Sequence, residues 1–241
     1  MGKFFFKPHE RVGQGVELTG NVAHYIINVL RIRKGQEQIL CDGEGTNYSA
    51  ILESISDKPL SATFALLNAF PSLPEPPAPI TLFQGLPKGD KMDWIIEKTV
   101  EAGISEIVPV ITHRTVVKVK DSCKLLSRYS RIAESAASQS MRGLIPNVSK
   151  PLCFTKAIAL SKAESTIVAF EKEKSRSIKA VLCNKSPAPL NLWIGPEGGF
   201  EDDEIAALTD IGAIPVSLGP RILRTETSGV FALAQILCLW E

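Results

Sequence analysis

A proline-rich segment from Pro71 to Pro79 divides the chain and restricts what each half can form. Five of these nine residues are proline, which lacks a backbone N–H donor and favours extended geometry. Neither a helix nor a central strand is expected to run through such a segment. We therefore predict a short linker at residues 71–79, with one domain at residues 1–70 and a second at residues 80–241.

The pattern before the linker is mostly that of β-structure. Residues 36–56 indicate strand, turn and strand, because the glycines of Asp42-Gly43-Glu44-Gly45 supply the positive φ angles of a tight hairpin. A further strand is expected at residues 60–70 and a short helix at residues 24–31. The result is a small β-rich domain of about 70 residues, a size that folds alone only marginally.

After the linker, strand and helix patterns alternate. Met92, Ile95 and Ile96 recur at helical spacing, and Gly103 follows as a C-terminal cap. A long helix is expected at about residues 123–142. Such alternation predicts a mostly parallel sheet covered on both faces. Its strands are expected at residues 80–86, 104–111, 166–170, 190–194 and 213–218.

The bulk properties indicate a globular cytoplasmic protein. Hydrophobic residues make up 44% of the chain and the net charge is +1. No stretch approaches the roughly 18 to 20 apolar residues of a membrane helix, and the N-terminus does not fit a signal peptide. The five cysteines are scattered without Cys-x-x-Cys spacing, which predicts neither a metal site nor a redox pair.

The first of two candidate ligand loops follows the strand at residues 190–194. It contains Gly195, Gly198 and Gly199, which let backbone amides approach a ligand closely at the carboxyl end of a strand. Four acidic residues, Glu201–Glu204, then begin a helix and would repel an anion. The loop also lacks both phosphate-binding fingerprints. A cationic, neutral or zwitterionic ligand fits it better; the alternative is a plain glycine turn.

The second loop, at residues 216–228, again follows a strand and contains Gly219-Pro220. Thr225 or Thr227 is expected to cap a final helix that is apolar enough to be buried nearly all round. The free amides at the start of that helix would then face a binding site. Arg221 and Arg224 precede it, either as site residues or as solvated surface.

These two loops, taken together and in this order, resemble the ribosomal RNA small subunit methyltransferase E family of the SPOUT superfamily. The resemblance rests mainly on Ile194-Gly-Pro-Glu-Gly-Gly-Phe200 and Leu218-Gly-Pro-Arg-Ile-Leu-Arg-Thr-Glu-Thr227. Weaker similarity extends over the whole chain. It includes residues 24–31, 34–35 and 42–43 of a PUA-like β-barrel, and residues 88–101, 113–118 and 134–142 of a methyltransferase domain.

The resemblance implies an α/β fold in which a trefoil-knotted SPOUT methyltransferase domain follows a small PUA-like β-barrel domain. Knots are rare exceptions among protein chains. It further implies a homodimer that uses S-adenosyl-L-methionine to methylate N3 of one uridine in the 16S rRNA of the small ribosomal subunit. The partner is then RNA rather than DNA or a membrane.

The needs of this reaction, together with the place of Arg224 and Glu226 at the start of the final helix beside the second loop, indicate roles for individual residues. Arg224 is expected to stabilise charge developing on the uracil oxygens, and Glu226 to act as the base that removes the N3 proton. The expected cofactor contacts come from both loops and the neighbouring strand: Phe170, Ile194, Gly195, Glu197, Gly198, Gly199, Ser217, Leu218, Gly219, Ile222, Leu223 and Thr227.

RNA contact is expected to be electrostatic. The candidate residues are Arg31, Arg33, Lys34, Lys88, Arg114, Arg131 and Arg142, of which the first three form the densest cluster. Two other functions stay open. One is a SPOUT methyltransferase acting on another RNA position such as a ribose 2′-hydroxyl, and the other is a non-catalytic RNA-binding assembly factor. A dinucleotide-dependent oxidoreductase is disfavoured because Gly-x-Gly-x-x-Gly is missing.

Overall fold

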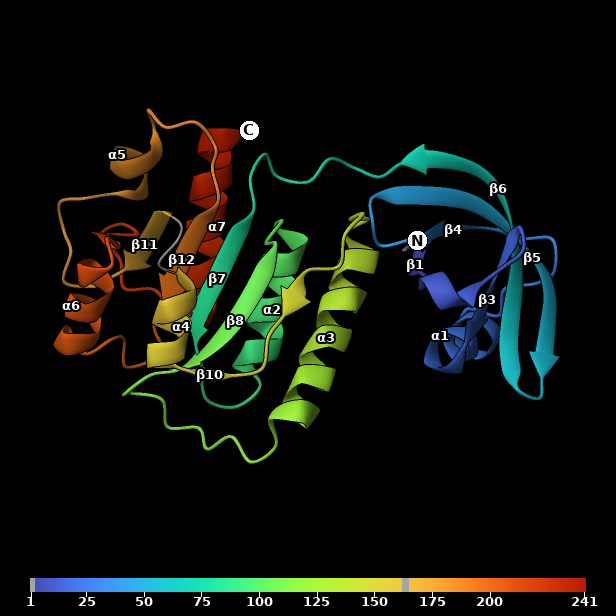
Figure 1. The fold of residues 1–241 in the computed structure, drawn as a ribbon, viewed down its shortest axis with the longest axis horizontal. Helices are drawn as coiled ribbons and strands as arrows, with labels where there is room; N and C mark the ends of the chain where they lie inside the picture. Colours follow the sequence, from blue (N-terminus) through green and yellow to red (C-terminus); the bar gives the residue numbers. More distant parts are fainter. Residues whose placement is uncertain (1–2, 162–164) are drawn as a thin grey trace. The chain divides into compact units, whose positions relative to one another are not determined.

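A computed structural model describes residues 3–161 and 165–241, and the chain divides into two compact units (Figure 1). The first unit comprises Met1–Glu75 and Ala137–Ile145. The second comprises Pro76–Ala136 and Pro146–Glu241. The division at Glu75 falls within the predicted linker. The inclusion of Ala137–Ile145 in the first unit was not predicted from the sequence.

The first unit is built on a six-stranded, mostly antiparallel sheet. The predicted hairpin is confirmed: β4 (Glu37–Cys41) pairs with β5 (Thr46–Asp57), and β5 pairs with β6 (Leu60–Pro71). Only β1 runs parallel to its neighbour among the described strands of this sheet. The full strand order is β1 (Phe4–Phe5), β4, β5, β6, β3 (Gly15–Thr19) and β2 (Arg11–Val12).

A short helical segment covers the core of this sheet. The helix expected at residues 24–31 begins earlier, with α1 (Gly20–His24), and continues as a π-helical turn at Tyr25–Val29. It ends before Arg31, whose φ of 53° leaves the helical region. Its inward side contributes to a buried apolar cluster that is otherwise drawn from the strands: Phe6, Val16, Leu18, Ile26, Ile32, Leu40, Ala50, Leu52, Ala62 and Phe64.

The segment Ala137–Ile145 is bound to the first unit by hydrogen bonds. The carbonyl of Gly143 accepts a hydrogen bond from the backbone N–H of Gly45 at 3.2 Å, and Glu44 forms a β-bridge with Leu144.

β6 ends at Pro71, so the extended segment starts one residue later than predicted. Proline is tolerated at this end of β6 because Pro71 pairs with a strand on one side only, through Thr46 of β5, so its missing N–H leaves no hydrogen bond unmade on the other side.

The second unit contains the predicted parallel sheet. All its pairings are parallel, in the order β10, β8, β7, β12, β11 and β13, and β9 also pairs with β8. The strands are β7 (Ile80–Gly85), β8 (Glu106–Ile111), β9 (Asn147–Val148), β10 (Leu152–Cys153), β11 (Ser165–Ala169), β12 (Leu190–Ile194) and β13 (Ile214–Val216). The connecting helices are α2 (Lys91–Glu101), α3 (Ser122–Gln139), α4 (Phe154–Ser161), α5 (Ile178–Leu182), α6 (Asp202–Asp210) and α7 (Thr225–Trp240).

Side chains from both faces of this sheet are buried, as the continuous apolar strands predicted. On one face, Phe83 stacks on Trp193 with ring centroids 4.6 Å apart, in a cluster that includes Ala157 of α4 and Ile205 of α6. On the opposite face, Leu82 lies beside Gly229 of α7. Helices therefore cover both faces, with α7 packed against α2 and α5.

Two predicted helix ends differ from the structure. α3 ends at Gln139 rather than residue 142, and Met141 has a positive φ of 61°. The N-terminal cap of α7 is Arg224, so the prediction of a threonine cap was wrong. Thr225 is instead the first helical residue, and its hydroxyl is used in a tertiary contact described below. Within the described residues, no helix is long and apolar enough to cross a membrane.

Candidate active site

A cavity of about 530 Å³ lies in the second unit, at the carboxyl ends of β11, β12 and β13. This is where parallel α/β sheets usually bind ligands. We call residues 195–201 the first loop and residues 217–224 the second loop. The cavity is lined by both loops, by the end of β11 and by the first residues of α2 and α7: Lys91, 169–171, Lys174, 194–199, 217–226 and Ser228.

The structure brings the two sequence motifs together around this cavity. Arg224 and Glu226 line it, and so does every predicted cofactor contact except Thr227. The backbone N–H of Thr227 donates to the carbonyl of Arg224 at 2.9 Å in the first turn of α7. Ser228, which was not predicted, lines the cavity on that side.

The backbone of the first loop is held at both ends. The Gly195 carbonyl accepts hydrogen bonds from the Thr225 hydroxyl at 2.6 Å and from the Gln84 amide at 3.4 Å. Further along, the N–H of Gly199 donates to the Pro196 carbonyl at 2.9 Å, with a φ of 70° that favours glycine. The loop then enters α6 through a capping box between Glu201 and Glu204. This loop is therefore a preformed wall.

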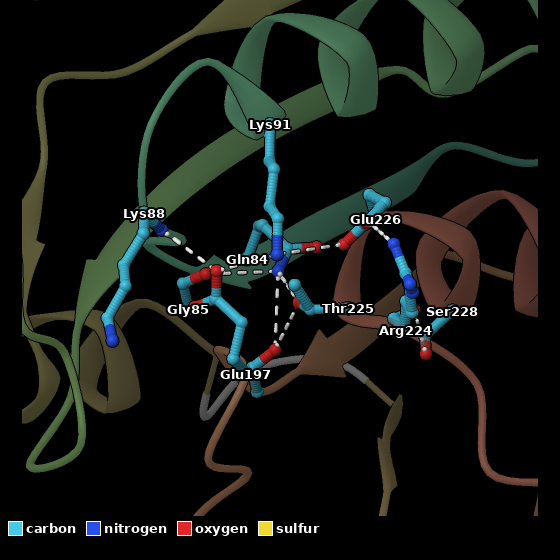
Figure 2. Close-up of polar contacts among 10 residues, drawn as sticks. Gln84, Gly85, Lys88, Lys91, Glu197, Arg224, Thr225, Glu226 and Ser228 are labelled. Atoms are coloured by element: carbon cyan, nitrogen blue, oxygen red, sulfur yellow. Dashed lines mark hydrogen bonds and ion pairs between the residues drawn. The ribbon is translucent and has the colours of Figure 1, made fainter.

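Gln84 is a functional candidate that sequence reasoning missed. Its side chain is fully buried at the end of β7, and its amide also donates to the Thr225 hydroxyl at 3.0 Å. Gln84 thereby joins the first loop to the start of α7 (Figure 2). Only the amide nitrogen is hydrogen-bonded, since Oε1 is buried without a partner among the described residues. The hydrogen bonds that the nitrogen donates restrict the geometry around Gln84.

Glu197, predicted to contact the cofactor, uses its carboxylate to bind the start of α2. Its Oε1 atom accepts hydrogen bonds from Lys91 Nζ at 2.9 Å and from the Lys88 backbone N–H at 3.1 Å. Burial raises the pKa of Glu197, but these hydrogen bonds outweigh burial and leave the pKa below its usual value. The Glu197 carboxylate is therefore ionised, and its hydrogen bonds connect α2 to the first loop.

The predicted catalytic pair lies at the start of α7. The Arg224 side chain is 84% exposed, and its Nη1 atom lies 4.0 Å from Glu226 Oε1. The Glu226 side chain is only 18% exposed, with Oε2 3.5 Å from Lys91 Nζ. Figure 2 shows the Glu226 carboxylate between Lys91 and Arg224.

Arg114, predicted to bind RNA, supports the first loop from outside. Its guanidinium donates to both carboxylate oxygens of Glu201, at 2.8 and 2.9 Å, and to the Gly198 carbonyl. The hydrogen bond from Arg114 holds the pKa of Glu201 below its usual value. This contact gives Arg114 a role in the loop that sequence reasoning missed, and RNA contact by it stays a prediction.

The other predicted RNA contacts fall into two groups. Arg31, Arg33, Lys34, Lys88 and Arg131 have exposed side chains. Arg142 is only 8% exposed, and its guanidinium donates to Glu75 within the first unit. The buried position does not present Arg142 to a ligand at the surface, so we no longer count it among the candidates.

Two protein-family models match this chain. The RNA methyltransferase domain matches residues 74–237, and the RNA methyltransferase PUA domain matches residues 18–65. The first match covers the whole cavity wall and the second covers most of the antiparallel sheet. The two matches therefore correspond to the two halves separated by the proline-rich segment.

The chain is similar to proteins from two bacteria that carry the name ribosomal RNA small subunit methyltransferase E. It is 35% identical to the one from Bacillus subtilis over 91% of this chain and 88% of that protein. The identity to the one from Synechocystis is 36%, over 97% and 76%. A crystal structure of the Neisseria gonorrhoeae protein of the same name, bound to S-adenosyl methionine, superposes with a TM-score of 0.88 at 31% identity, covering 100% and 98% of the two chains.

Proposed function

The chain belongs to the ribosomal RNA small subunit methyltransferase E family, and from this we infer that it methylates N3 of one uridine in 16S rRNA, using S-adenosylmethionine. The observation that carries this inference is the cavity formed where the two motif loops meet the start of α7. A substrate in the small ribosomal subunit would make the cytoplasm the site of action.

The residues around the cavity fit this cofactor. The cavity volume of about 530 Å³ lies inside the usual range for small-molecule sites, roughly 300 to 1,000 Å³. The glycine-rich first loop offers backbone groups without side chains to an uncharged base. The wall carries charges of both signs, with the carboxylates of Glu171, Glu197 and Glu226 beside the cations Lys91, Lys174, Arg221 and Arg224. Such a wall suits a ligand that has a cationic centre and a zwitterionic tail.

In this proposal the chain's residues position the acceptor uridine and remove its N3 proton. The cofactor supplies an electrophilic methyl group on a sulfonium ion. Uridine N3 carries a proton that must leave for attack to occur, and the Glu226 carboxylate is the base we assign to accept it. The exposed Arg224 guanidinium offers donors for the negative charge that then develops on the uracil oxygens.

The proposed function is tested in two steps. Calorimetric titration of the free protein with S-adenosylmethionine should show saturable binding. Incubation with unmodified small subunits, followed by nucleoside digestion, should then yield N3-methyluridine. A 2′-O-methylated nucleoside would show that the acceptor is a ribose 2′-hydroxyl and not uridine N3. RNA binding without any methylated product would identify a non-catalytic factor.

We also propose that the first unit contacts the rRNA through Arg31, Arg33 and Lys34. All three side chains are exposed on one short segment, while the intervening Ile32 is buried in the core. Reversing two charges, Arg33→Glu with Lys34→Glu, should weaken binding to the small subunit by roughly tenfold at about 0.1 M salt. Arg31 is left unchanged because its positive φ makes substitution a backbone change as well.

The matched control for this variant is Lys179→Glu with Lys185→Glu, which also reverses two exposed charges. Binding is measured by filter retention over a series of salt concentrations, and cofactor affinity by calorimetry. Only the first variant should bind RNA more weakly, and neither should change the affinity for S-adenosylmethionine. Equal loss of RNA binding in both variants would remove the claim of a specific surface.

Dimerisation is a further part of the proposal. The side of α7 opposite its buried residues carries an apolar stripe of Val230, Ala234 and Cys238, of which the last two are exposed. A second copy of the chain would cover it. Sedimentation equilibrium should report a dimer, and Ala234→Arg should shift it towards monomer; a wild-type monomer at all concentrations would contradict the proposal.

We propose, finally, that the second unit is knotted, with α7 threaded through a preceding loop. The proposal follows from the family to which the chain belongs. The hydrogen bond from Thr225 to Gly195, thirty residues earlier in the chain, places the start of α7 beside the first loop. A knot persists when a chain is pulled from its ends. In an optical trap the unfolded protein should therefore extend less than an unknotted chain of 241 residues, and full extension would refute the knot.

A further inference from the structure

Lys91 occupies a position between the two halves of the active site. It is the first residue of α2, an element that belongs to neither motif loop. Its ammonium lies 2.9 Å from Glu197 Oε1 in the first loop and 3.5 Å from Glu226 Oε2 at the start of α7. Figure 2 shows the lysine reaching down between the two carboxylates. One cation thus forms ion pairs with two carboxylates that belong to different elements.

The contact with Glu197 gives Lys91 a fixed anchor. The same Glu197 oxygen accepts a hydrogen bond from the backbone N–H of Lys88, in the turn that leads into α2. The hydrogen bond to Glu197 is also the main cause that raises the pKa of Lys91, against the opposing effect of burial. The ammonium therefore stays charged and stays close to the first loop.

Glu226, by contrast, has few restraints of its own. Its Oε2 atom is buried and has no hydrogen-bond partner among the described residues, and its other oxygen lies 4.0 Å from the exposed Arg224 side chain. The positive charge of Lys91 is the nearest group that can hold this carboxylate. A carboxylate that acts as a base must be held within hydrogen-bond reach of the proton it accepts.

We propose that Lys91 is a positioning residue, which holds the Glu226 carboxylate at the cavity wall and links it to Glu197 in the first loop. Lys91 acts through Glu226 and transfers no proton. This inference rests on the proposed function, because it presupposes that Glu226 acts on the acceptor. It predicts an effect on turnover rather than on folding, since ion pairs between partly exposed groups contribute little to stability.

The test compares two lysines of the same helix. Lys91→Met should lower kcat by roughly ten- to a hundredfold, as expected when a reacting group is displaced by about an ångström. The Kd for S-adenosylmethionine, measured on the free protein by calorimetry, and the thermal midpoint should stay close to wild type. Lys91→Arg should recover most of the turnover, because it restores a cation of similar reach.

Lys98→Met is the matched control. Lys98 also binds two carboxylates, Glu97 and Glu101, and its side chain is 33% exposed against 36% for Lys91, but it does not line the cavity. Its loss should leave kcat unchanged. A control variant as slow as Lys91→Met would show that α2 needs its ion pairs for structure and would overturn the proposal.

A double variant decides whether Lys91 acts through Glu226. Adding Lys91→Met to Glu226→Gln should lower kcat no further, because the group that Lys91 positions is already inactive. Additive losses, or a weakened Kd for S-adenosylmethionine with kcat retained, would overturn the positioning role. If Glu226→Gln alone turns over normally, the base assigned in the proposed function fails; if it is slow while Lys91→Met is not, only the present inference fails.

Discussion

Gly195→Ala should weaken the binding of S-adenosylmethionine by roughly five- to 150-fold, or abolish it. A Cβ at Gly195 would lie 2.9 Å from Cα and 3.0 Å from the carbonyl carbon of Gly199, so it meets backbone and not a flexible side chain. The loop cannot shift to relieve this contact without breaking the buried hydrogen bonds to Thr225 and Gln84. Overpacking of this kind costs about 1–3 kcal/mol, which corresponds to that range in Kd.

Gly229→Ala is the control for this prediction. Gly229 lies on α7 next to Gln84, but a Cβ there would make ordinary contacts of 3.6 to 3.7 Å. The substitution also removes a glycine from a helix, which favours the folded state. Calorimetric titration should show near wild-type affinity for Gly229→Ala and weak affinity for Gly195→Ala, with both proteins folded by circular dichroism. Equal affinities would show that the first loop is not the cofactor wall.

The elements of the second unit could be predicted from the sequence because their signals are local. The five strands that were predicted are short apolar runs, and β12 begins and ends at the residues expected, whereas the two-residue strands β9 and β10 were not predicted. Glycines after the strands marked both loops, and the rule that ligands bind at the carboxyl ends of parallel strands joined them into one site. Local composition was sufficient for each step.

The residues that connect the two loops could not be found in this way. Gln84 appears in the sequence as a polar interruption of an apolar strand, and its partners Gly195 and Thr225 lie 111 and 141 residues away. Lys91 is one of many charged residues on an amphipathic helix. Glu197 was expected at the cofactor and Arg114 at the RNA, but the sequence did not indicate the partner of either, because partners are set by tertiary packing.

The boundaries of the first unit show the same limitation. The proline-rich segment marks one boundary, since proline restricts the backbone locally. No such local signal marks residues 137–145, because their place in the first unit depends on hydrogen bonds between residues far apart in the sequence, from Gly45 to the Gly143 carbonyl and from Arg142 to Glu75. In addition, the predicted helix ran to residue 142, so the end of α3 and the start of this segment were not recognised. Linear division into domains therefore misses a segment that belongs to the other unit.

Arg224→Ala should lower kcat by roughly a hundred- to a thousandfold, the effect of removing one donor that stabilises charge in a transition state. Arg224 caps α7 at the cavity wall, and 84% of its side chain is exposed, so its donors remain available to the acceptor. Because the side chain is not packed into the wall, the Kd for S-adenosylmethionine and the thermal stability should change little. Single-turnover methylation with saturating cofactor and small subunits measures the chemical step.

Arg221→Ala provides the comparison, since it removes the same residue type from the same loop. Its loss should reduce the rate by less than about tenfold, because Arg221 lies farther from the start of α7 and is exposed at the rim of the cavity. If the two variants were equally slow, and only below saturating concentrations of small subunits, the arginines would act together by attracting RNA. If Arg224→Ala alone stays slow at saturation, the deficit lies in the transition state, which is where the charge on the uracil oxygens develops.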